Sequence, residues 1–401
     1  MNSFRILQVT PFYPPDKGGI ATHTLNLSNQ LSKSGHDITI VAPRPRRIKY
    51  KPSANALKKI LTIPSVYLPG WPYPTLKSFS IPVDFGKQLD EIIKTGNFDI
   101  IHAHGHHYPI TWSALRSAAK YGIPSVLTLH GMYALNPHVD GGKSNFEVMF
   151  NKLVFKRVLR KTNCVIGLTK QITDYGRTFA TRKTSFYTIG NGVDTQKYHE
   201  NLNRKLQFRQ KYNIPIGSKV VLFVGRFEHV KGILELSRAA KSLIQAGASD
   251  LHIVLVGAGS LDKEVRSILD RVDSAQVLSW QSSETIHELY IASDFFILPS
   301  KFEALPITII EAMNAGLHII YTPVGGVSDV LEHYAPKTMI RSCTTVDIRS
   351  AISRLLTDNQ SQTDIKESIR YSQNFDWSKI AASVADVYSM MSFGKLKVNS
   401  G

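Results

Sequence analysis

Two carboxylates in a short stretch give the sequence its clearest chemical pattern. Residues 294–300, Asp-Phe-Phe-Ile-Leu-Pro-Ser, predict a strand buried on both faces, because its apolar residues do not alternate with polar ones. Glu303 follows in a loop, and Pro306 and Gly316 suit the first residue and the stop of a helix. Glu311 then lies about 7 Å along that helix. Because a helix N-terminus favours phosphate, we expect a phosphate site here, with Glu311 placed for a ribose hydroxyl. The plainer alternative is one loop acid and one solvated helix acid.

Two cations follow a second buried strand. Residues 219–225 predict this strand, and Arg226 and Lys231 lie before the next helix. The forked guanidinium group of an arginine and the compact charge of a lysine suit a diphosphate leaving group. The alternative is that both residues are ordinary surface charges.

Gly257 and Gly259 follow the strand expected at 252–256 and superficially resemble a dinucleotide fingerprint. Asp262 stands where the third glycine would be, so a dehydrogenase is disfavoured. We expect the two glycines to form a turn beside a nucleotide.

The first half of the chain opens in a similar way. A strand at 4–10 is followed by Gly18 and Gly19 and by a helix pattern over 20–34. A glycine pair at a strand-to-helix turn lets the backbone approach a ligand, although turn geometry alone also explains it.

Histidines follow two further predicted strands. His102, His104, His106 and His107 lie in or just after the strand at 98–104, and three interpretations stay open: metal binding, cleft lining and a structural role. No Asp, Glu or Cys within the next ten residues completes a ligand set. His130 ends the strand at 125–129, where α/β proteins bind ligands, and we favour a functional role for it.

Composition limits the class of protein. The 401 residues, 43% of them hydrophobic, are enough for two packed α/β domains. Cys164 and Cys343 are too few for a disulfide framework and suggest a reducing compartment. The N-terminus lacks a signal-peptide pattern, and no apolar run approaches the roughly 20 residues that span a bilayer. We therefore expect a cytoplasmic protein.

Positive charge is concentrated in the first half. Residues 1–195 carry a formal charge of +15 and residues 196–401 carry +2. Seven basic residues fall within 44–59, and the helix expected at 147–161 has apolar residues, Leu153 among them, on one side and basic ones on the other. The 44–59 segment could contact an anionic membrane, and a solvated basic loop is the alternative. The helix is expected to face the core with its apolar side and solvent with its basic side, and membrane contact is the secondary interpretation. No nucleic-acid-binding motif is recognised.

Taken together, these stretches resemble the family 4 retaining glycosyltransferases of the group 1 class. The resemblance is carried by Glu303-x7-Glu311, the Gly-Gly turn, the 98–104 strand, His130, the Gly-Arg-x4-Lys segment ending at Lys231, and the Asn191-Gly-Val-Asp turn. It implies an α/β fold of two facing Rossmann-like domains (GT-B). These would be an acceptor-side domain at 1–194, a donor domain at 195–374, and a helix and tail at 375–401 returning to the first domain.

The resemblance also implies roles for individual residues. Glu303, His130, Arg226 and Lys231 would be catalytic. The donor would be bound by the following residues: Gly18, Gly19, Glu311, Asn191, Gly257, Gly259, Leu305 and Ile307. Two departures from the family pattern are Ser279, where glycine is usual, and Ala304-Leu305-Pro306 after the first glutamate. The first puts the identity of the donor base in doubt.

The implied activity is retaining, metal-independent transfer of a sugar from a UDP- or GDP-sugar. The acceptor would be a glycan or a lipid-linked molecule of cell-surface polysaccharide or glycolipid synthesis, and an anionic cytoplasmic membrane face is the candidate place at which the protein would reach it. No Asp-x-Asp metal motif, no cofactor and no nucleic-acid partner are expected. Two alternatives remain. A GT-B epimerase or phosphorylase would isomerise a free sugar or need pyridoxal phosphate, and a non-catalytic nucleotide-sugar binder would bind donor without transfer.

Overall fold

The chain divides into two compact α/β units. Unit 1 comprises residues 1–191 and 377–401, and unit 2 comprises residues 192–376. The structure, a computed structural model, describes residues 3–14, 19–43, 59–63, 65–68, 79–82, 85–131, 148–180, 184–357 and 369–398. Gly18 and nearly all of the basic segment 44–59 lie outside these described residues.

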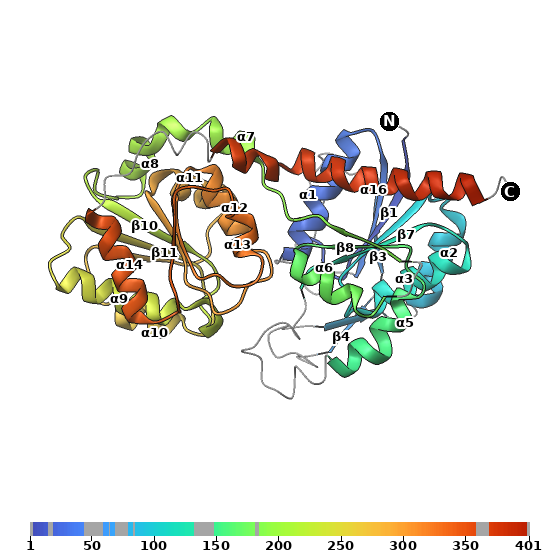
Figure 1. Cartoon of the computed structure of the whole chain (residues 1–401), viewed down its shortest axis with the longest axis horizontal. Helices are drawn as coiled ribbons and strands as arrows, with labels where there is room; N and C mark the ends of the chain where they lie inside the picture. Colours follow the sequence, from blue (N-terminus) through green and yellow to red (C-terminus); the bar gives the residue numbers. More distant parts are fainter. Residues whose placement is uncertain are drawn as a thin grey trace. The chain divides into compact units, whose positions relative to one another are not determined.

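Unit 1 is built on a seven-stranded parallel sheet in the order β3-β2-β1-β6-β7-β8-β9 (Figure 1). Its strands are β1 (Arg5–Val9), β2 (Asp37–Pro43), β3 (Lys59–Ile63), β6 (Ile100–His104), β7 (Ser125–Leu129), β8 (Cys164–Gly167) and β9 (Ser185–Thr188). A separate antiparallel pair is formed by β4 (Ser65–Leu68) and β5 (Phe79–Pro82). The central strands are buried along their whole length, as their continuous apolar sequences predict.

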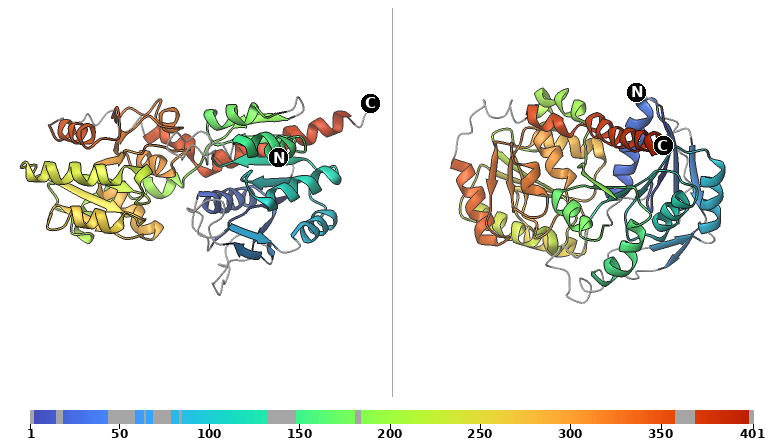
Figure 2. Two further views of the ribbon diagram at one scale, coloured as in Figure 1. Left: turned by 90° about the horizontal axis from the view of Figure 1, so that it is seen from below. Right: turned by 45° about the vertical axis from the view of Figure 1, so that its right-hand side comes forward.

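Helices cover the two faces of the unit 1 sheet (Figure 2). They are α1 (Gly19–Lys33), α2 (Phe85–Thr95), α3 (Pro109–Lys120), the π-helix η2 (Asn151–Phe155), α5 (Lys156–Leu159), α6 (Lys170–Arg177) and α16 (Trp377–Val398). Leu27 and Leu31 of α1 and Val384 and Tyr388 of α16 share one apolar core with the strands. The last helix of the chain therefore belongs to unit 1, as the family resemblance implied.

Unit 2 contains a six-stranded parallel sheet in the order β12-β11-β10-β13-β14-β15. Its strands are β10 (Lys219–Val224), β11 (Leu251–Val256), β12 (Ala275–Leu278), β13 (Phe295–Leu298), β14 (His318–Tyr321) and β15 (Lys337–Met339). Its α-helices are α7 (Thr195–His199), α8 (Lys205–Lys211), α9 (Ile233–Gln245), α10 (Asp262–Ile268), α11 (Ser283–Ala292), α12 (Ile307–Asn314), α13 (Val327–Val330) and α14 (Thr345–Thr357). Short 3₁₀ turns are η3 (Leu202–Arg204), η4 (His229–Lys231) and η5 (Gln373–Phe375).

Each parallel sheet has a point where the strand order reverses. In unit 1 it lies between β1 and β6, and in unit 2 between β10 and β13. Helices that leave adjacent strands at such a point go to opposite faces, so the loops at the carboxyl ends of the strands separate and leave room for a ligand. The two reversal points are therefore the positions in the fold where binding residues are expected.

None of the helices within the described ranges combines the length and apolar character needed to cross a bilayer.

Candidate functional site

The reversal point of unit 2 brings Lys231 and Glu303 together. Lys231 ends the turn after β10, and Glu303 lies in the loop after β13. The Lys231 Nζ atom is 2.6 Å from Glu303 Oε1, and the two side chains are 18% and 7% exposed. Ser300 Oγ donates a hydrogen bond to the same carboxylate oxygen at 2.6 Å. Two residues 72 positions apart in sequence thus form one charged centre.

Arg226 lies in the same loop as Lys231, directly after β10, and its side chain is exposed. One fixed cation and one exposed cation therefore occupy the carboxyl edge of the sheet, an arrangement that suits a multiply charged anion.

Glycines allow the neighbouring loops to pack backbone against backbone. A Cβ atom on Gly257 would lie 1.8 Å from the carbonyl oxygen of Gly225, and one on Gly259 would lie 2.3 Å from that of Phe227. Gly325, in the loop after β14, has φ +56°, and a Cβ there would lie 1.7 Å from the carbonyl oxygen of Glu303. Close packing of the loops thus explains why these three positions require glycine. The predicted nucleotide contacts of Gly257 and Gly259 stay predictions.

Glu311 lies on α12, behind the loop that carries Glu303. The helix begins one residue later than predicted, because Pro306 is extended and caps it, and Gly316 follows its end at φ +72°. Burial raises the pKa of Glu311 to about 7, although a hydrogen bond with Tyr290 opposes this rise. Glu311 is therefore a carboxyl group that titrates near neutral pH. The predicted donor contacts Leu305, which is buried, and Ile307, the first helical residue, flank the same helix start.

In unit 1 four histidines gather at the carboxyl ends of β6 and β7. The rings of His102 and His104 are stacked with centroids 4.5 Å apart, as alternate positions on a strand allow. His104 Nδ1 is 3.1 Å from His130 Nε2. His23 of α1 joins them, and its Nδ1 lies 2.9 Å from Asn191 Oδ1. His23 was missed by sequence reasoning, since only the fold shows which face of α1 meets the strand ends.

Burial keeps these histidines neutral. It lowers the pKa of His23 to about 4 and that of His102 to about 3. The pKa values of His104 and His130 are also well below their usual value, first through burial and then through the neighbouring imidazoles. One nitrogen from each of His23, His104 and His130 lies within 4.8 Å of the others, a spacing that a metal ion could bridge with some ring movement. The sequence-based expectation of no metal is not tested by this geometry.

Gly19, the described member of the glycine pair, is the first residue of α1. Among the described residues no atom lies within 4 Å of a side chain built at Gly19, so these residues do not require glycine there, and its predicted approach to a diphosphate stays a prediction.

Two family models together match most of the chain. The model described as Glycosyltransferase Family 4 matches residues 17–197, and the one described as Glycosyl transferases group 1 matches residues 204–371. The chain belongs to the family 4, group 1 glycosyltransferases.

Curated relatives agree with this assignment. The teichuronic acid biosynthesis glycosyltransferase TuaC of Bacillus subtilis is 28% identical over 345 residues, 81% of this chain and 82% of the relative. The D-inositol 3-phosphate glycosyltransferase of Corynebacterium aurimucosum is 23% identical and covers 93% of this chain and 91% of its own.

Solved structures confirm the two-domain GT-B fold. Sucrose-phosphate synthase from Thermosynechococcus elongatus superposes with a TM-score of 0.73 at 18% identity, covering 96% of this chain and 99% of its own. HepE of Anabaena, solved with UDP and glucose, superposes with a TM-score of 0.69 at 18% identity, with coverages of 96% and 99%. The prediction of two Rossmann-like domains in this glycosyltransferase is therefore confirmed.

The helix expected at 147–161 of this glycosyltransferase is partly wrong. Its described part begins at 148, and the π-helix η2 inserts a wider turn that changes which side chains face the core. Phe155 is fully buried, whereas Leu153, predicted to face the core, is 51% exposed, as is Met149.

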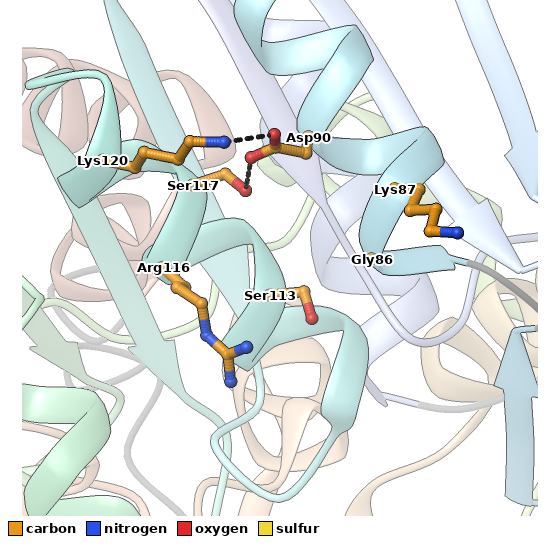
Figure 3. A pocket seen from close by; sticks show the side chains of 7 residues that line it. All are labelled: Gly86, Lys87, Asp90, Ser113, Arg116, Ser117 and Lys120. Atoms are coloured by element: carbon orange, nitrogen blue, oxygen red, sulfur yellow. Dashed lines mark hydrogen bonds and ion pairs between the residues drawn. The ribbon is translucent and has the colours of Figure 1, made fainter.

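A shallow cavity of about 240 Å³ lies between α2 and α3, and none of its lining residues is a predicted site residue (Figure 3). It is lined by Gly86, Lys87, Asp90, Ser113, Arg116, Ser117 and Lys120. Asp90 already accepts hydrogen bonds from Ser117, Lys120 and Tyr121, each at 2.7 Å. These bonds connect α2 to α3, so we assign this cluster a structural role in the glycosyltransferase.

Proposed function

We propose that this glycosyltransferase transfers a sugar from a nucleoside-diphosphate sugar to a glycan or lipid-linked acceptor, with retention of the anomeric configuration and without a metal ion. The observation that carries the proposal is the Lys231–Glu303 pair at the reversal point of the unit 2 sheet. A cation and a carboxylate lie together at the sheet edge where, in this proposal, the nucleotide sugar binds.

The residues then have distinct tasks. Arg226 and Lys231 neutralise the diphosphate as the bond from the sugar C1 to the phosphate oxygen breaks. The acceptor oxygen bonds to C1 on the same face, and its proton passes to the departing phosphate oxygen. Glu303 orients the sugar hydroxyls, Glu311 accepts from the ribose, and His130 contacts the donor sugar.

Lys231 pairs with Glu303, so a bound diphosphate would compete with this carboxylate for the ammonium group. Substituting Lys231→Ala is expected to lower kcat at least a hundredfold, the usual order for loss of one preorganised charge-stabilising group. Lys211→Ala is a matched control, because Lys211 Nζ also pairs with a glutamate, Glu288, at 2.6 Å. Full transfer activity in Lys231→Ala would refute the assignment, and loss of activity on EDTA treatment would refute metal independence.

The donor base is testable by ligand-induced thermal stabilisation with UDP, GDP, ADP and CDP. A ligand at 100 times its Kd stabilises the folded protein by about 2.7 kcal/mol, so a true donor base stands out in melting curves. We expect UDP or GDP to respond. No response at millimolar concentration would count against the donor site.

We further propose an acceptor of cell-surface polysaccharide or glycolipid synthesis, reached at an anionic membrane surface. The relative named for teichuronic acid biosynthesis supports this class of product. On unit 1, the exposed Met149 and Leu153 lie beside exposed basic residues, Lys152, Lys156 and Arg157. Apolar side chains flanked by positive charge suit an interface with anionic lipid headgroups.

Flotation with vesicles containing phosphatidylglycerol tests the membrane proposal. Replacing both Met149 and Leu153 by serine should reduce flotation several-fold, because about two apolar contacts are lost. The same double change at Met339 and Val346, which are 54% and 75% exposed on unit 2, is the control and should leave flotation unchanged. Equal flotation with neutral vesicles would contradict the proposal.

A further inference from the structure

We propose that Gln8 is a positioning residue that decides which ring nitrogen of His130 carries the proton, acting through His104. Gln8 Oε1 is 2.7 Å from His104 Nε2, and His104 Nδ1 is 3.1 Å from His130 Nε2. The three side chains form one line of hydrogen bonds from the middle of the sheet to its carboxyl edge. The inference rests on the proposed function in one respect, the contact of His130 with the donor sugar.

The direction of each bond follows from the number of protons available. His104 is fully buried and neutral, so it has one N–H group. An amide oxygen only accepts, which places that hydrogen on His104 Nε2 and leaves Nδ1 with a lone pair. His130 Nε2 must therefore be the donor, and His130 Nδ1 is left as an acceptor suited to a sugar hydroxyl.

The other end of the Gln8 amide bonds to a residue near the end of the chain. Gln8 Nε2 donates to the hydroxyl of Tyr388, on α16, at 3.4 Å. The same hydroxyl is 2.6 Å from His102 Nδ1, and His102 Nε2 is 2.7 Å from Thr128 Oγ1. Rotating the amide by half a turn would reverse every bond in the line and place the hydrogen of His130 on Nδ1 instead. The Tyr388 and Thr128 hydroxyls can accept or donate and so fit both arrangements, which leaves the Gln8 amide as the group that selects between them.

The competing explanation is a metal ion held by His23, His104 and His130. If the ion bound His104 Nδ1 and His130 Nε2, both nitrogens would need lone pairs, whereas a hydrogen bond across the 3.1 Å between them requires a proton on one. The bond between His104 Nε2 and Gln8 fits either explanation, because a metal-bound histidine also donates its other ring N–H, so metal content is measured alongside.

Nitrogen NMR of the full chain labelled with ¹⁵N-histidine tests the proposal without any substrate, because protonated and unprotonated ring nitrogens have well-separated shifts. The His130 signals are assigned as those absent in His130→Gln. We expect the wild-type protein to show one His130 tautomer, protonated at Nε2. Gln8→Met, of similar size but without the amide, should show the second tautomer at a comparable population.

Thr111→Val is the matched control, since Thr111 is buried and its hydroxyl donates at 2.8 Å to the carbonyl oxygen of His104, not to the ring. It should leave the His130 spectrum unchanged. If Gln8→Met does not fold, Gln8→Leu also removes the amide and should also produce the second tautomer. A wild-type His130 protonated at Nδ1, unchanged spectra in both folded variants, or one zinc ion per purified chain would overturn the proposal.

Kinetics separate this inference from the proposed function. In Gln8→Met we expect kcat to fall up to about tenfold, which corresponds to about 1.4 kcal/mol in the barrier. Affinity for the nucleoside diphosphate alone, which has no sugar for His130 to contact, should stay the same. Wild-type protein that binds no nucleoside diphosphate would refute the proposed function and leave the tautomer result standing.

Discussion

Replacing Glu311 by glutamine should stabilise unit 2 at alkaline pH and remove part of its pH dependence. Burial raises the pKa of Glu311 from 4.5 to about 7. At one pKa unit per about 1.4 kcal/mol, ionising this carboxyl in the folded protein costs about 3 kcal/mol. Glutamine has the same shape and no charge, so this cost disappears in the variant.

The sign follows from proton binding. Between pH 4.5 and 7 the folded state keeps the proton of Glu311 while the unfolded state has released it. The stabilisation is therefore complete below pH 4.5, is lost as pH rises toward 7, and is absent above it. We expect Glu311→Gln and wild type to have similar free energies of unfolding at pH 4.5 and to diverge by about 3 kcal/mol at pH 8, with the variant the more stable.

Urea unfolding read by pulsed hydrogen exchange and mass spectrometry is the suitable assay, because peptides from unit 2 are followed separately from those of unit 1. Glu288→Gln is the control of opposite sign. Burial opposes ionisation of Glu288, but hydrogen bonds from Lys211 and Tyr212 outweigh burial and lower the pKa. Its variant should be less stable than wild type at pH 8. A constant difference between Glu311→Gln and wild type across this pH range would refute the reasoning.

Three further predictions concern the same unit. Ser300→Ala should lower kcat by up to about tenfold, because Ser300 holds the Glu303 oxygen that Lys231 also contacts, whereas Ser237→Ala, which loses a buried hydroxyl bonded to Ile233, should leave turnover unchanged. Gly325→Ala should lower the melting temperature and weaken donor binding, since φ +56° and the carbonyl of Glu303 both exclude a side chain; Gly217→Ala, with open space around it, is the comparison in the same melting and binding assays. Affinity for the nucleotide donor should fall as pH drops below 7, because a protonated Glu311 is a poorer acceptor for ribose, and titration calorimetry at pH 6 and pH 8 would show equal affinities if this is wrong.

Much of the fold could be predicted because its strands are buried on both faces. The continuous apolar runs at 219–224 and 251–256 formed β10 and β11 with the expected bounds to within about a residue. The pairing of Lys231 with Glu303 was harder to predict from the sequence. Each residue was identified from its own loop, but only the strand order places the loops after β10 and β13 side by side.

Other features could not be found from local patterns. The exposure of Leu153 depends on a π-turn that shifts the helical register, and no helical periodicity predicts where that turn occurs. Burial of Glu311 beside Tyr198 and Tyr290 depends on contacts from α7 and α11, which are far away in sequence. A role for Gln8 was not predicted for a similar reason, because the function of a glutamine within a buried strand can be inferred only when its hydrogen-bond partners are known.

The membership of α16 in unit 1 has a consequence for how the protein is made. Strands 1 to 9 leave the ribosome first, but Trp377, Val384 and Tyr388, which complete their apolar core, are synthesised only after all of unit 2. At about 5–20 residues per second, this delay lasts roughly 10–40 seconds. During that interval unit 2 can already fold, whereas the first unit still exposes the surface that α16 will cover. The nascent chain is therefore most vulnerable to aggregation and chaperone capture in the half that is translated first, and a chain interrupted before residue 377 would keep that exposed surface permanently.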